Sequence, residues 1–90
     1  MSNGDARTPG LPATLVEVVA ANIRAECALR GISQQQLAAA IGINRTAVVA
    51  RWYGKRQWQV EDIEKVAAYL CIDPAALFRL DERHLPKAAA

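Results

Sequence analysis

The sequence has little of the chemistry that metal sites, disulfide scaffolds and membrane spans require. Its 90 residues include only two cysteines, Cys27 and Cys71, and one histidine, His84. The cysteines lack the CxxC spacing of a zinc or redox site, and small disulfide-stabilised domains use several more. No apolar stretch approaches the roughly 20 residues that cross a bilayer, and no signal-peptide pattern opens the chain. We therefore expect a reduced, cytoplasmic protein with no metal and no membrane contact.

Groupings of residues that perform catalysis are also missing. His84 stands apart from any cysteine or acid framework, so neither a metal site nor a catalytic triad is expected. Cys27 lies in an apolar pattern, where a buried inert thiol is more common than a nucleophile. There are no paired acids and no phosphate-binding loop. The sequence thus predicts that the protein is not an enzyme and has no catalytic residue, cofactor or small-molecule ligand.

Acidic residues are absent from one long part of the chain. The net charge is only +2, but no Asp or Glu occurs between Cys27 and Val60. The five basic residues of that segment are Arg30, Arg45, Arg51, Lys55 and Arg56. The rest of the chain has six bases against nine acids. Such a basic segment attracts polyanions, and a DNA backbone is the commonest polyanion that a small helical domain meets.

Two capping boxes predict the first two helices. In this motif a hydroxyl accepts the backbone amide three residues later, while the side chain of that later residue reaches back. Thr14 with Glu17 has this spacing, and so has Ser33 with Gln36. After Thr14, apolar residues recur at three- and four-residue steps until Gly31 ends the run, which predicts one long helix. The helix that follows Ser33 is expected to be short.

Three further helices are expected downstream. A tight turn at Gly42 leads to Asn44, which caps a third helix at about residues 45–53. An apolar stripe that begins at Ile63 predicts a fourth helix, and Asp73 followed by proline predicts a short fifth one. No strand pattern and no internal repeat is present. The chain is therefore expected to be all-α, with a compact five-helix fold.

The second and third of these helices resemble a helix-turn-helix, in which one helix braces the other and leaves its outer face free. Residues 34–54, with residues 60–78 after them, look like the Cro/CI-type family of phage repressors and bacterial regulators. Two segments match that family closely: LAAAIGI at residues 37–43 and AAYLCIDP at residues 67–74. The resemblance implies a repressor-like helix-turn-helix domain whose third helix lies in the major groove of DNA.

The resemblance also implies which side chains meet DNA. The groove-facing residues, expected to contact bases, are Asn44, Arg45, Thr46, Val49 and Ala50. The residues expected to contact the DNA backbone are Gln34, Arg51, Tyr53, Lys55 and Arg56. Their chemistry fits these roles, because arginine can donate two hydrogen bonds to guanine and small apolar groups can meet a thymine methyl. Cations near phosphates set the register without reading sequence.

Two positions depart from the family pattern. Arg51 stands where many members carry an apolar anchor, so either its methylene stem packs or the helix rotates and Trp52 anchors it alone. Cys71 takes a place usually held by glycine after the fourth helix. Both tryptophans, Trp52 and Trp58, are interpreted as core residues rather than as platforms for single-stranded bases.

The helix-turn-helix DNA-binding domain is expected to span residues 12–80. Residues 1–11 are small, polar and broken by glycine and proline, which predicts a flexible N-terminal arm. Residues 81–90 are either a C-terminal tail or a weak partner-binding extension. On the long first helix, Arg24 or Arg30 could reach the DNA backbone, and the spacing leaves both choices open.

We interpret the chain as a sequence-specific double-stranded DNA-binding transcriptional regulator, a phage-type repressor or Cro-like protein at the nucleoid of a bacterial or phage-infected cell. A homodimer on a pseudo-palindromic operator is expected, with half-sites one helical turn apart. By elimination its surface involves Phe78, Leu80 and Leu85, unless these residues finish the core. The alternative is an antitoxin-like or anti-repressor module that uses the same helix on a protein partner. Rising salt should weaken DNA binding but not an apolar protein contact.

Overall fold

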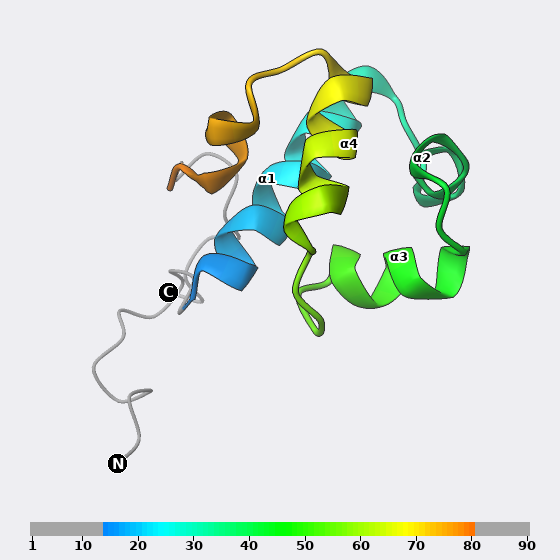
Figure 1. Cartoon of the computed structure of the whole chain (residues 1–90), viewed down its shortest axis with the longest axis horizontal. Helices are drawn as coiled ribbons and strands as arrows, with labels where there is room; N and C mark the ends of the chain where they lie inside the picture. The colour runs from blue at the N-terminus through cyan, green and yellow to red at the C-terminus, as the bar shows by residue number, and fades with distance from the viewer. Residues whose placement is uncertain (1–13, 81–90) are drawn as a thin grey trace.

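The computed structural model of the chain describes residues 14–80, which form four α-helices and one short 3-10 helix. The elements are α1 (Leu15–Arg30), α2 (Gln34–Ile41), α3 (Arg45–Trp52), α4 (Val60–Leu70) and the 3-10 helix η2 (Pro74–Phe78). Figure 1 shows α1 and α4 side by side, with α2 and α3 on one side of this pair and η2 on the other. The described residues contain no strand, which confirms the all-α prediction for this part of the chain.

Both predicted terminal segments, the arm at residues 1–11 and the tail at residues 81–90 with Leu85, lie outside the described residues. The domain boundaries at residues 12 and 80 therefore stay predictions. Within residues 14–80, no helix combines the length and the apolar character that crossing a membrane requires.

The expected fifth α-helix is instead the 3-10 helix η2. Its start is as predicted, because the Asp73 carboxylate accepts a hydrogen bond from the Ala75 amide at 2.9 Å and Pro74 occupies the first turn. The Ala76 amide bonds to the Asp73 carbonyl at 2.9 Å, three residues back. A five-residue element is too short for the i to i−4 ladder of an α-helix to repay its nucleation, whereas short 3-10 turns are common connectors. The prediction of five α-helices is therefore wrong, because the described residues form four α-helices and one 3-10 helix.

The starts of α1 and α2 follow the two capping boxes. Thr14 Oγ1 accepts from the Glu17 amide at 3.3 Å, and Glu17 Oε1 accepts from the Thr14 amide at 3.1 Å. Ser33 and Gln36 make the same reciprocal pair at 3.1 and 2.8 Å. At the other end of α2, Gly42 has the left-handed φ of 78° that stops the helix.

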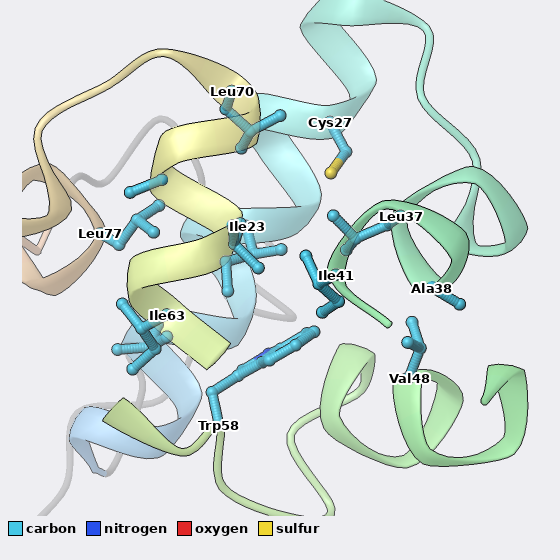
Figure 2. Close-up of a cluster of buried hydrophobic side chains, with 13 residues drawn as sticks. Ile23, Cys27, Leu37, Ala38, Ile41, Val48, Trp58, Ile63, Leu70 and Leu77 are labelled. Atoms are coloured by element: carbon cyan, nitrogen blue, oxygen red, sulfur yellow. The ribbon is translucent and has the colours of Figure 1, made fainter. Parts of the chain in front are cut away.

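One apolar core joins α1, α2 and α4, and Figure 2 shows its centre. Ile23 of α1, Leu37 of α2 and Val66 of α4 are fully buried there. Trp58 reaches from the loop before α4 toward Ile41 of α2 (Figure 2). Its exposed fraction is 5%, which confirms the interpretation of this tryptophan as a core residue.

A buried amide fixes the end of the described chain onto α1. Asn22 Nδ2 donates to the carbonyl of Leu77 at 2.9 Å and to that of Arg79 at 2.7 Å. Asn22 thereby satisfies carbonyls that would otherwise lose their hydrogen bonds on burial, so it stabilises the return of the chain against α1. No sequence pattern marks this residue, because its partners are backbone groups 55 and 57 positions away.

The end of α4 carries backbone strain. Cys71 closes this helix at φ 60° and ψ 45°, and it is the one non-glycine residue with positive φ among residues 14–80. A Cβ in the left-handed region crowds the following carbonyl, which costs roughly 1–2 kcal/mol. Cys71 therefore occupies a conformation that glycine adopts without this cost, at the position where the family resemblance expects glycine.

Cys71→Gly should raise the free energy of unfolding by roughly 0.5–1 kcal/mol, because relief of the strain exceeds the entropy that glycine loses on folding. Urea unfolding followed by circular dichroism measures the change. Cys71→Ser keeps the Cβ and serves as the matched control, with an expected change within about 0.5 kcal/mol. An unchanged or lowered stability of the glycine variant would contradict the strain.

Candidate nucleic-acid interface

The two helices α2 and α3 are joined by a tight turn at residues 42–44. The Gly42 and Ile43 amides both donate to the Ala38 carbonyl, at 2.9 and 3.2 Å, which fixes the direction in which the chain leaves α2. Val48 is the single fully buried residue of α3. Figure 2 shows it facing Ala38 of α2. α3 is thus anchored to the domain by one side and keeps most of its surface outside the core.

The start of α3 is the predicted asparagine cap. Asn44 is exposed, and its Oδ1 accepts from the Ala47 amide at 2.8 Å. A two-bond contact with an adenine edge needs both the oxygen and the nitrogen of a side-chain amide. While Asn44 caps α3, one of the two lone pairs of its Oδ1 is engaged, so Nδ2 is the group that is free to meet a base.

The other four predicted base-contacting residues lie on one face of α3, because their spacing places them together on the helix circumference. Arg45 and Thr46 are exposed, and Val49 and Ala50 are half-buried. Val48 lies on a different side and points into the core. The outward face of α3 therefore combines a cation, a hydroxyl and two small apolar side chains.

The residues predicted to contact the DNA backbone lie at the edges of this face. Gln34 begins α2 and is half-buried, whereas Tyr53 directly follows α3 and is exposed. Lys55 and Arg56 are also exposed, and their amides donate to the Ala50 carbonyl at 3.0 and 3.3 Å. These hydrogen bonds keep both cations next to the end of α3.

Arg51 packs differently from the other cations. It is half-buried, and its Nε is buried with no hydrogen-bond partner among the described residues. The methylene stem therefore packs against the domain, as the first of the two alternatives for this position expected. Trp52 is half-buried and packs against the core as well, so it does not anchor α3 alone.

The cations near α3 have no acidic partner within residues 14–80. The ion pair found there joins Arg30 Nη1 and Glu26 Oε1 at 2.6 Å, both on α1. No acid occurs in α2, in α3 or in the loop that follows them. Arg45, Lys55 and Arg56 thus present positive charge to solvent, and unpaired surface cations of this kind attract phosphates.

Arg24 has a partner that the sequence did not reveal. Its Nη1 donates to the carbonyl of Trp52, the last residue of α3, at 2.6 Å. The sequence left open whether Arg24 or Arg30 reaches the DNA backbone. In the structure the described contacts of both are internal, since Arg30 pairs with Glu26. A backbone carbonyl 28 positions away leaves no trace in a local pattern.

The described residues hold no group of histidine, cysteine and acidic side chains that could bind a metal ion. Cys27 is buried in the core, and this burial raises the pKa of its thiol from 9.0 to about 11. The thiol therefore stays protonated at neutral pH, as expected for a structural cysteine.

A short helix braced by α2, anchored through one buried valine and flanked by cations that have no acidic partner within residues 14–80 defines a helix-turn-helix domain of the DNA-binding class. The family of Cro/C1-type HTH DNA-binding domains matches residues 22–82. Because this match covers most of the chain, the chain belongs to that family. It is a DNA-binding transcription regulator.

Solved structures of regulators have the same fold. The chain is similar to the restriction-modification controller protein C.AhdI from Aeromonas hydrophila, with 30% identity and a TM-score of 0.65 over 70% of this chain and 96% of that one. It is also similar to the hypothetical transcription factor NHTF from Neisseria, with 32% identity and a TM-score of 0.73 over 81% and 86%. The clp gene regulator ClgR from Corynebacterium glutamicum shares the fold at 22% identity, with a TM-score of 0.68 over 71% and 68%. A search of curated protein sequences finds no match.

Asn44→Ala should lower the free energy of unfolding by about 1 kcal/mol, because the Ala47 amide loses its acceptor at the start of α3. Asn44→Ser retains a capping oxygen and should stay within a few tenths of a kcal/mol, roughly, of the unchanged protein. Thermal unfolding of the two variants side by side measures the difference. Equal losses in both would mean that the cap does not stabilise α3.

Proposed function

We propose that the protein is a sequence-specific repressor-type regulator that reads double-stranded DNA with α3 in the major groove. The observation that carries this proposal is the outward face of α3, which is polar or small and lies beside cations without acidic partners. An α-helix fits the width of the major groove, where each base pair presents a distinct pattern of donors, acceptors and methyl groups. The family membership supports the same use of this helix.

The base-contacting roles follow from the chemistry of the exposed face. Arg45 carries a guanidinium that can donate two hydrogen bonds to the guanine edge, and the Thr46 hydroxyl or methyl can meet a neighbouring base. Val49 and Ala50 are short enough to let the helix approach a thymine methyl. Asn44 contributes mainly its Nδ2 amino group, because its oxygen caps α3.

The contacts to phosphate come from residues at the edges of α3. Lys55 and Arg56 supply charge after the helix, and Gln34 and Tyr53 supply neutral donors on either side of it. Such contacts set orientation and register and carry no sequence information. Arg51 contributes less than the other cations, since its buried Nε shortens the reach of its side chain.

A homodimer fits the size of the reading helix. α3 has only eight residues and covers a few base pairs, so two copies on a pseudo-palindrome with half-sites one turn apart give a longer site. Phe78 and Leu80 keep 38% and 57% of their surface exposed, whereas Leu77 is fully buried. Neither Phe78 nor Leu80 belongs to the core cluster of the described residues, and we propose both for the dimer surface.

Selection of bound duplexes from a random pool tests this proposal. The unchanged protein should return a pseudo-palindrome whose half-sites lie one helical turn apart. Arg45→Ala should relax the preference at one position in each half-site and cost about 1–3 kcal/mol per contact.

Lys55→Ala is the matched control, because it removes one charge beside the same helix. It should return the same sequence, weaken all duplexes alike and reduce the slope of log affinity against log salt by about one. Failure to enrich any duplex at low salt would contradict DNA reading and favour the protein-interaction module. An unchanged selection with Arg45→Ala would remove that residue from the base-reading face.

A further inference from the structure

The C-terminal end of α3 is completed by a side chain from another helix. The last four carbonyls of an α-helix have no donor within the helix. In α3 these belong to Val49, Ala50, Arg51 and Trp52. Backbone amides just downstream bond to the first three, at 3.3, 3.0 and 3.1 Å. The fourth carbonyl, that of Trp52, accepts from the Arg24 guanidinium of α1 at 2.6 Å.

The charge of Arg24 strengthens this contact. A guanidinium is always protonated, and hydrogen bonds from charged donors are shorter and stronger than neutral ones. The end of α3 carries the negative pole of the helix dipole, which favours a cation there. Arg24 is half-buried, so water screens the contact less than it would at the open surface.

A second contact places α1 against the same end of α3. A Cβ added to Gly54, two residues past α3, would lie 3.7 Å from Ala20 Cβ and 3.9 Å from Glu17 Cγ. Glu17, Ala20 and Arg24 are spaced by three and four residues, so they form one stripe on α1. This stripe of α1 packs against the turn after α3, while α2 packs against Val48, the buried side chain of α3 (Figure 2).

A short helix with one buried anchor can pivot about that anchor unless a second point is fixed. Val48 is the fully buried anchor of α3, Trp52 packs against the core at the far end, and Arg24 holds the Trp52 carbonyl there. Hydrogen bonds to base edges weaken steeply with small errors in distance and angle. The orientation of α3 against the core therefore decides how well Arg45 meets a base.

We propose that Arg24 is a positioning residue for DNA reading: it fixes the angle of α3 through the Trp52 carbonyl and makes no contact with DNA. This inference rests on the proposed function of α3 as the reading helix. The competing role for a cation here is a phosphate contact, which acts through charge and depends on salt. The two roles predict different results from the same variant.

Arg24→Gln removes the charged donor, and Arg30→Gln is the matched control. Both substitutions remove one positive charge from α1, but Arg30 pairs with Glu26 on its own helix. Arg24→Lys keeps the charge on a shorter side chain and tests for rescue. Each protein is measured free, by hydrogen exchange of its amides, and then against the selected duplex and an unrelated duplex over a range of salt.

Arg24→Gln should speed exchange of the Tyr53 and Lys55 amides about tenfold, with α4 unchanged, because the end of α3 opens locally. Affinity for the selected duplex should fall about tenfold more than in Arg30→Gln, the scale of one lost base contact. Affinity for the unrelated duplex and the salt slope should match those of Arg30→Gln. Arg24→Lys should recover part of both losses.

Three outcomes would overturn the inference. A salt slope reduced by about one relative to Arg30→Gln would make Arg24 a phosphate contact. Equal losses of specific affinity in Arg24→Gln and Arg30→Gln would mean that the loss of one positive charge on α1 explains the weaker binding. Unchanged amide exchange would show that Arg24 does not fix α3. The exchange measurement needs no DNA, so it decides whether Arg24 fixes α3 even if the unchanged protein fails to bind a duplex, a result that would contradict the proposed function instead.

Discussion

The rest of the structure depends on one constraint, which is that α3 must be held rigidly while contributing a single fully buried side chain. Val48 supplies the fully buried anchor, and the half-buried Trp52 adds a second contact with the core at the end of the helix. A cap within the helix stabilises the start of α3, and a hydrogen bond from α1 holds its end to the domain. Asn44 caps the start and the Arg24 guanidinium completes the end. Because the core contacts of Val48 and Trp52 and the Arg24 hydrogen bond hold the helix, its outer face is left for DNA.

Acidic side chains are confined to one part of the domain, away from α3. The acids of the described residues lie on α1 and α4 or directly after α4, and none lies on α2, on α3 or in the loop between α3 and α4. Consequently Lys55 and Arg56 lie beside α3 without an acidic partner among residues 14–80, while Arg30 pairs with Glu26 on α1. The half of the domain formed by α2, α3 and the loop after them therefore carries the positive charge that attracts phosphates. The other half, with η2 and Asn22, stabilises the fold.

Local signals in the sequence predict local structure well. The starts of the helices at Thr14, Ser33 and Asn44 could be predicted because a cap and its partner lie within three residues of each other. The 3-10 form of η2, the Asn22 contacts and the Arg24 contact could not be predicted. The last two join groups at least 28 positions apart through backbone carbonyls, which have no residue type to recognise. The base-contacting residues remain predictions, although the structure leaves Arg45 and Thr46 exposed.

The central claim is that the region from the cap of α3 through the basic loop after it forms the DNA-binding surface. The most direct measurement is a titration of the isotope-labelled protein with mixed-sequence duplex in dilute buffer, followed by nuclear magnetic resonance of the backbone amides. The account predicts that the shifts concentrate at residues 44–56 and fade as salt is added. Shifts centred on α4 or η2, or no response to duplex at all, would contradict it.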